Sequence, residues 1–226
     1  MEELPLNTES PASRTQSVKP NVHVENIKRK TKIYSSYFIQ QLKKPSQAFN
    51  HGESEFRSSL VSIIIFTALV TASIFLFIND LYGSNSPSFL SFFMETFLLT
   101  FSIIGLVIFA SFLISNFFGP QHSFRTIISS FGGQLSTPII LVTASIFLML
   151  LESFTYGNAI LTICLIFTLF ILPLYVITFL LTKSHSSVDP LYGFILYIVI
   201  FTILLMLFFT IVGNSKMVEY FITVLV

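Results

Sequence analysis

The sequence predicts an all-α integral membrane protein, a five-helix transmembrane bundle with short amphipathic helices on its inner surface. The first observation is composition: 53% of the 226 residues are hydrophobic and 10% are charged, which is more apolar surface than a soluble domain of this size can bury. The second is a series of five long apolar runs behind a polar head that ends before Leu60. The third is the placement of the basic residues, which indicates how the runs are oriented.

Composition divides the chain into three parts. The beginning is rich in Pro, Ser, Thr, Asn and Glu without apolar periodicity, which predicts a disordered cytoplasmic tail over residues 1–33. Residues 34–59 are predicted to form a juxtamembrane amphipathic segment, and residues 60–226 the transmembrane domain. The first apolar run begins too late for a cleaved signal peptide, so we expect it to act as an uncleaved anchor.

Each apolar run can cross a bilayer as a helix. The first extends roughly 28 Å at about 1.5 Å per residue, close to a hydrocarbon core of about 30 Å. The second is longer than needed, so residues 89–94 are expected in the interface. The third contains Pro138 in its first turn, where a missing amide hydrogen costs little. The five predicted spans are 60–78, 97–118, 135–151, 159–181 and 191–212.

The basic residues predict the orientation of these spans. Of the 12 Lys and Arg, all but one lie in the head or in the two loops on the same side of the bundle, which contain Arg125 and Lys183. Asp80 and Glu152 follow spans on the opposite side. Because positively charged segments stay in the cytoplasm, we expect a multi-pass protein of the cell membrane with its amino terminus inside and its carboxyl terminus outside.

A basic and aromatic segment precedes the first span. Its aromatic and aliphatic residues recur at helical spacing, which predicts a short helix that lies on the membrane and ends before Pro45. Each basic residue near anionic inner-leaflet lipids is worth about 1 kcal/mol, and aromatic residues this close to a span favour lipid over nucleic acid. The residues of this candidate lipid or partner surface are Lys28, Arg29, Lys30, Lys32, Tyr37 and Phe38.

A second surface helix is predicted between the second and third spans. Phe124, Ile127, Ile128 and Phe131 are spaced i, i+3, i+4 and i+7, Arg125 lies on the other face, and two glycines end the pattern. One interpretation is a gate or a partner-binding shelf formed by Phe124, Arg125, Ile127 and Phe131. The other is an amphipathic linker without further function.

The first and third predicted spans share a repeated sequence. The segment LVTASIFL occurs at residues 69–76 and again at 141–148. The two copies are predicted to run in the same direction, which indicates either a parallel duplication, as some transporters have, or a chance match within apolar sequence.

Candidates for chemistry are few. The sequence contains no paired acids within the spans, no metal-ligand spacing, no phosphate loop and no nucleophile elbow, so we expect neither a cofactor nor an enzymatic activity. Glu95 is the best candidate for an intramembrane polar site, although it can also extend to the outer interface. Pro173 predicts a break in the fourth span, either at a binding site or as a packed kink.

Two short segments resemble a known family. YFIQQLKKPSQAF, at 37–49, and SFRTIISSFGG, at 123–133, are similar to the corresponding segments of bacterial members of the Yip (Ypt-interacting protein) family. The resemblance covers roughly residues 34–212 and implies a cytoplasmic head and five membrane helices. In eukaryotic relatives it implies a non-catalytic part in vesicle trafficking and membrane shaping. The chain lacks the paired cysteines of the zinc ribbon that some bacterial relatives carry, and no GTPase-contacting residue can be transferred.

These observations support two hypotheses on function. The first is a non-enzymatic adaptor or membrane organiser that binds a protein or lipid partner at the inner surface. The alternative is a small-solute or ion transporter, or a permease subunit, for which the repeat, Glu95 and Pro173 are the evidence.

Overall fold

The computed structural model describes residues 22–49, 52–83, 86, 88–118, 122–183 and 189–212. Within this part of the chain every regular element is a helix, so the predicted all-α class is confirmed. Residues Met1–Ser35 and Ser36–Val226 form two compact units, and each is described by itself.

The first helix, α1, runs over Val22–Lys43. Its start corrects the predicted tail, because residues 22–33 are helical; they contain no Gly or Pro and several good helix formers. Its end agrees with the prediction, since a proline disfavours the helical conformation of the residue before it and Pro45 follows Lys44. The predicted tail residues 1–21 lie outside the described residues.

Two 3₁₀ helices, η1 (Pro45–Phe49) and η2 (Gly52–Glu55), lead to α2 (Phe56–Tyr82). The predicted segment 34–59 is therefore the end of α1, two short turns and the start of α2. Helix α3 (Phe89–Phe118) is continuous from its first residue. At about 1.5 Å per residue it extends roughly 45 Å, so one helix includes both the predicted interfacial part and the predicted span.

The predicted surface helix and the third predicted span are two helices that meet at a bend. Helices α4 (Phe124–Gln134) and α5 (Ser136–Leu150) meet at an angle of 44°. The break has a local cause, because Pro138 has no amide hydrogen to donate to the carbonyl of Gln134, four residues earlier.

The fourth predicted span contains a second irregularity. Helix α6 (Phe154–Ile166) passes through a π-helical turn, η4 (Phe167–Ile171), into α7 (Leu172–Lys183). The amide of Leu172 donates to the carbonyl of Phe167, five residues earlier, as in a π-helix. The buried Pro173 lies just after this turn and cannot donate to the carbonyl of Leu169. Both breaks thus lie about four residues before a proline.

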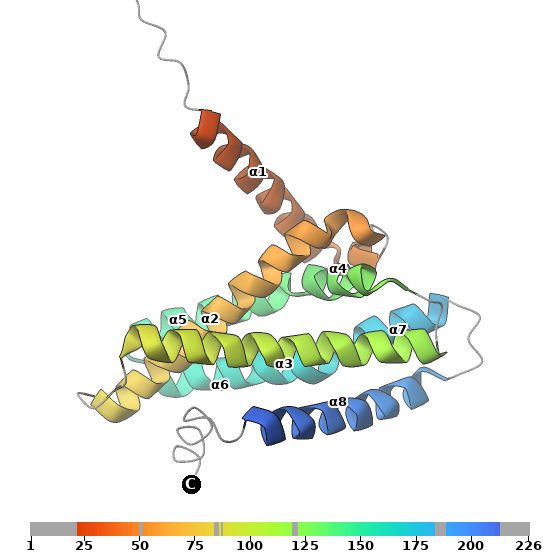
Figure 1. Cartoon of the computed structure of the whole chain (residues 1–226). Coiled ribbons are helices and arrows are strands. Elements are labelled where there is room, and N and C mark those ends of the chain that lie inside the picture. The colour runs from red at the N-terminus through yellow and green to blue at the C-terminus, as the bar shows by residue number, and fades with distance from the viewer. Residues whose placement is uncertain are drawn as a thin grey trace, which may run out of the picture. The chain divides into compact units, whose positions relative to one another are not determined.

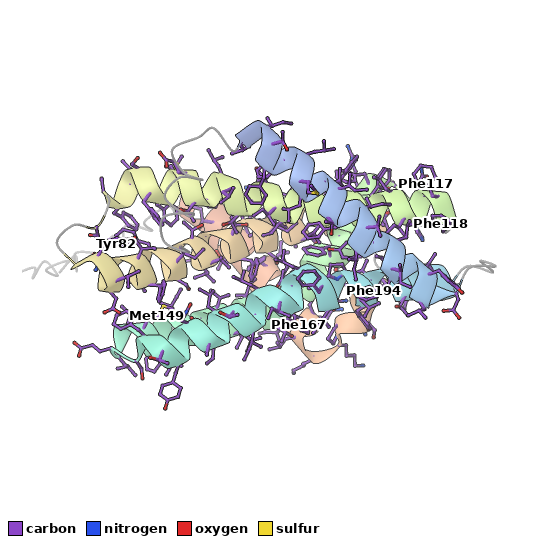
Figure 2. The ribbon with its side chains drawn as sticks, turned by 90° about the horizontal axis from the view of Figure 1, so that it is seen from below. Tyr82, Phe117, Phe118, Met149, Phe167 and Phe194 are labelled. Carbon is purple, nitrogen blue, oxygen red and sulfur yellow. The ribbon has the colours of Figure 1, made fainter. Side chains whose placement is uncertain are left out.

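Helix α8 (Pro190–Val212) completes the bundle, in which successive crossings run in opposite directions (Figure 1). Tyr82 and Met149 lie at one end of the bundle, and Phe117 and Phe118 lie at the other (Figure 2). Among the residues that the structure describes, four helices are long and apolar enough to cross a membrane, and the bent pair α4–α5 makes a fifth if it counts as one. Helix α8 is the least enclosed of the four, because it packs on α3 and α7 and leaves most of its surface exposed.

Candidate functional site

A folded layer covers one end of the bundle, where α2 begins and α3 ends. It consists of residues 36–49, 52–59 and 122–134, and we call it the basic platform. At its centre Tyr37 Oη lies 2.8 Å from Ser59 Oγ, which donates to the carbonyl of Ser129 at 3.0 Å. Because a serine hydroxyl has one hydrogen, Tyr37 is the donor to Ser59. One buried chain of hydrogen bonds therefore joins α1, α2 and α4.

Two glycines allow α4 to approach the rest of the platform closely. A Cβ atom at Gly132 would lie 2.6 Å from the Cβ and carbonyl oxygen of Ser59, and one at Gly133 would lie 2.6 Å from the Cβ of Ala48. The sequence pattern placed the end of a helix at these glycines. The structure corrects this, since α4 continues to Gln134 and uses both glycines for packing.

Side-chain hydrogen bonds attach the two 3₁₀ helices to the platform. Gln134 Nε2 donates to the carbonyl of Pro45 at 2.7 Å, across the start of η1. Gln41 Nε2 donates to Glu55 at 2.8 Å. Ser123, whose hydroxyl also accepts from the amide of Thr126 as the N-cap of α4, donates to Glu53 in η2.

The structure divides the predicted shelf on α4 into a buried and an exposed part. Ile127 and Phe131 are each 0% exposed, so they pack in the chain's own core and cannot contact a partner in this conformation. Phe124 is 42% exposed and packs edge-to-face on Phe112, and Arg125 is exposed with its guanidinium 5.9 Å from the ring centre of Phe56. Helical spacing placed Ile127 and Phe131 on one face, but it did not indicate that Ser129 and Ser130, between them in sequence, are buried as well.

The predicted surface on α1 is divided in the same way. Lys28, Arg29, Lys30 and Lys32 are exposed and belong to the amino-terminal unit. Tyr37 is buried through its bond to Ser59 and Phe38 is half-buried against the core, so these two rings do not form one free stripe with the basic residues.

Charge separates the two ends of the bundle. The exposed basic residues of the platform are Lys43, Lys44, Arg57 and Arg125. At the opposite end the exposed charged groups near the helix termini are Asp80, Glu95 and Glu152. Glu95 has Ser91 Oγ 3.5 Å away and lies in the second turn of α3. Its exposure favours the interfacial interpretation over an enclosed site.

A cavity of about 290 Å³ lies where the two helix breaks meet. Pro45 and Gln134 line it on the platform side, and Thr137 lines it from the start of α5. Phe167, Ile171 and Tyr175 line it from the π-helical turn and from α7. Pro173 itself is buried and does not line the cavity, but the irregular turn that precedes it does.

The two copies of the repeat lie on neighbouring helices, since α2 packs against α5. Val70 and Val142 are both buried, as are Ser73 and Ser145. The two serines nevertheless have different hydrogen-bond partners. Ser73 donates to the carbonyl of Leu69 in its own helix, and Ser145 donates to the carbonyl of Gly157 on α6 at 2.7 Å.

Three contributors to the platform were not predicted from the sequence: Ser59, Gln41 and Gln134. Ser59 stands just before an apolar run, where a polar residue normally only marks the end of a span. Its hydrogen-bond partners, Tyr37 and Ser129, are distant in the sequence. The one available signal was the pair of glycines beside Gln134, which can indicate close helix packing as well as a helix end.

Comparisons with known proteins agree with the extent of this fold. Residues 25–223 match a family model described as Domain of unknown function (DUF6574). No curated protein and no solved structure matches the chain. Among the described residues, no group of three or more His, Cys, Asp or Glu side chains is placed to hold a metal ion.

Proposed function

Because the chain belongs to the family described as Domain of unknown function (DUF6574), whose description assigns no activity, we propose a function from the geometry. The chain is a non-enzymatic, multi-pass protein of the cell membrane that acts as an adaptor or membrane organiser at the cytoplasmic surface. The observation that carries this proposal is the basic platform. It is a hydrogen-bonded layer on one end of a helix bundle, with exposed Phe124 and Arg125 at its edge.

Membrane insertion is supported by the lengths and the surfaces of the helices. Four helices are long enough to cross a hydrocarbon core of about 30 Å, and α8 exposes large apolar side chains such as Ile203, Met206 and Ile211. Exposed apolar surface of this extent requires lipid or a partner. The platform's basic residues support a cytoplasmic location for it, with the acidic end outside.

The basic residues of α1 support contact with anionic lipids of the inner leaflet. Lys28, Arg29, Lys30 and Lys32 are all exposed, and each contributes about 1 kcal/mol near such a surface. The platform is the candidate surface for a protein partner. Membership of the Yip family stays a prediction from the two segments, and it agrees with a non-catalytic role without supplying a partner.

Cysteine labelling tests insertion and orientation. Cys164 is the only cysteine and is buried, so Cys164→Ala provides a background for single cysteines at exposed positions. In intact cells an impermeant maleimide should label Asp80→Cys and Tyr156→Cys. It should label Lys44→Cys and Arg125→Cys only after permeabilisation. The reverse pattern would invert the orientation, and labelling of all four sites in intact cells would exclude the bundle as a set of spans.

Site-specific cross-linking tests the platform as a docking surface. A photoreactive residue at Phe124 should give a protein adduct of defined mass in cells, and the same residue at Tyr156, exposed at the other end, should not. The yield of this adduct should fall when Arg125→Gln is introduced. If Phe124 and Tyr156 cross-link only to lipid, the adaptor role is wrong.

A transporter or permease subunit remains the alternative, because two helix breaks border one cavity, an arrangement that transporters use for substrate sites. Solute or ion flux in reconstituted vesicles would favour it if Thr137→Phe, which narrows the cavity, abolished the flux. Thr143→Phe, at an exposed position of α5 that does not line the cavity, is the control.

A further inference from the structure

The cavity between the two helix breaks has a lining that indicates what it holds. Most of its surface comes from apolar groups, among them Phe167 and Ile171. The polar side chain at its platform side, Gln134, already donates its amide hydrogen to the carbonyl of Pro45. A polar solute would therefore lose its hydrogen bonds to water without gaining enough hydrogen-bond partners in the cavity. A hydrocarbon chain has no such hydrogen bonds to lose.

The cavity opens on the flank of the bundle. Ile171 is 49% exposed and Tyr175 is 43% exposed, and both line the cavity while they face outward from the fourth span. Thr137, on the opposite wall, is also exposed. In a bilayer this flank faces lipid, so lipid has direct access to the cavity from the side.

Positive charge lies at the platform side of the same cavity. Pro45 lines the cavity, and the residues before it, Lys43 and Lys44, are both exposed. The acids of the platform, Glu53 and Glu55, accept hydrogen bonds from Ser123 and Gln41. An anion beside Pro45 would therefore meet two exposed lysines.

We propose that the cavity binds one acyl chain of an anionic phospholipid, whose phosphate is held by Lys43 and Lys44. Phe49 of η1 packs edge-to-face at 5.5 Å on Tyr175, which lines the cavity, and stacks on Phe179 at 3.9 Å. The inference rests on the proposed membrane insertion and orientation. It assigns the cavity to a resident lipid rather than to a transported solute.

Fluorescence quenching tests the proposal, because the sequence contains no tryptophan. The full chain with Tyr175→Trp is reconstituted in neutral vesicles that contain a minor fraction of phosphatidylglycerol or phosphatidylcholine, brominated on the acyl chains. Quenching by the brominated phosphatidylglycerol should be about twofold greater than by the brominated phosphatidylcholine. Ile171→Trp, a second reporter on the same wall, should show the same preference.

Matched variants separate the site from the surrounding lipid. Tyr192→Trp, exposed at the start of α8, should be quenched equally by the two lipids. In the Tyr175→Trp background, Lys43→Gln with Lys44→Gln should remove the preference, and Thr137→Phe should reduce it while Thr143→Phe leaves it unchanged.

Each contrary result has a distinct meaning. Equal quenching by the two lipids at both Tyr175→Trp and Ile171→Trp would overturn the lipid site. A preference that persists without the two lysines would overturn their assignment to the phosphate. Absence of quenching at all positions, Tyr192→Trp included, would instead contradict insertion itself and with it the proposed function.

Discussion

The hydroxyl of Tyr197 donates a 2.7 Å hydrogen bond to the carbonyl of Leu169. That carbonyl is the one to which Pro173, without an amide hydrogen, cannot donate. Tyr197 is fully buried, and its ring stacks on Phe201 at a centroid distance of 5.7 Å. Helix α8 is thus attached to the fourth span at its irregular turn, and a side chain from one helix compensates for a defect in another.

We expect Tyr197→Phe to destabilise the bundle by roughly 1 kcal/mol, because the Leu169 carbonyl loses a buried donor while the ring is kept. Thermal unfolding in detergent should show a lower midpoint for this variant. Tyr192→Phe, on the same helix but 67% exposed, is the control and should leave the midpoint unchanged. An unchanged midpoint for both variants would mean that the bond contributes nothing to stability.

Gly132→Ala should destabilise the platform by about 1–3 kcal/mol, because its Cβ would clash with the backbone of Ser59, which cannot rotate away. The measurement is the unfolding midpoint together with the rate of proteolysis between α1 and α2. Gly105→Ala is the control, since a Cβ at this helical position of α3 meets nothing within 4 Å. It should raise stability by about 0.5–1 kcal/mol through helix propensity. Similar effects for the two variants would argue against close packing of α4.

The repeat offers an internal comparison of two serines. Ser145→Ala should cost about 0.6 kcal/mol, and at most about 1.7, because it removes a bond between α5 and α6. Ser73→Ala removes only a bond within α2 and should cost less. The difference between their unfolding midpoints measures the interhelical bond. A larger effect at Ser73 would show that the interhelical contact is not the stronger one.

The basic residues of α1 should respond to lipid charge. An environment-sensitive dye on Ser36→Cys, in the Cys164→Ala background, should shift to the blue in vesicles of anionic lipid relative to neutral lipid. Changing Lys28, Arg29, Lys30 and Lys32 together to Gln should remove about 4 kcal/mol of attraction at low salt and with it the shift. Because salt screens exposed charges, added salt should have the same effect. A shift that is independent of lipid charge and of salt would exclude electrostatic docking.

Much of the bundle follows from the length of its apolar runs. The predicted spans 60–78 and 191–212 lie within α2 and α8, and α2 extends beyond its predicted span by residues 56–59 and 79–82. Pro138 and Pro173 were visible in the sequence, but the size of each break depends on what packs against the freed carbonyl groups. The bend of 44° and the π-helical turn were therefore not predictable.

The candidate site was less predictable than the fold. The spacing of Ile127 and Phe131 shows that they share a face of α4, yet the same spacing is found whether that face contacts lipid, a partner or the chain itself. Here α4 packs against α2, and the chain's own core covers both side chains. The cavity and the bond of Gln134 to Pro45 join residues that are far apart in sequence, so no local pattern indicates them.

The short helix α5 has a consequence for the surrounding bilayer. Its 15 residues extend only about 22 Å at about 1.5 Å per residue, which is less than a hydrocarbon thickness of about 30 Å. The bend of 44° turns α4 away from the direction of α5, so α4 does not lengthen this crossing. The difference between helix length and hydrocarbon thickness would therefore be confined to the side of the protein where α5 lies. In the membrane arrangement proposed above, lipids beside α5 would thin or tilt to match this short helix.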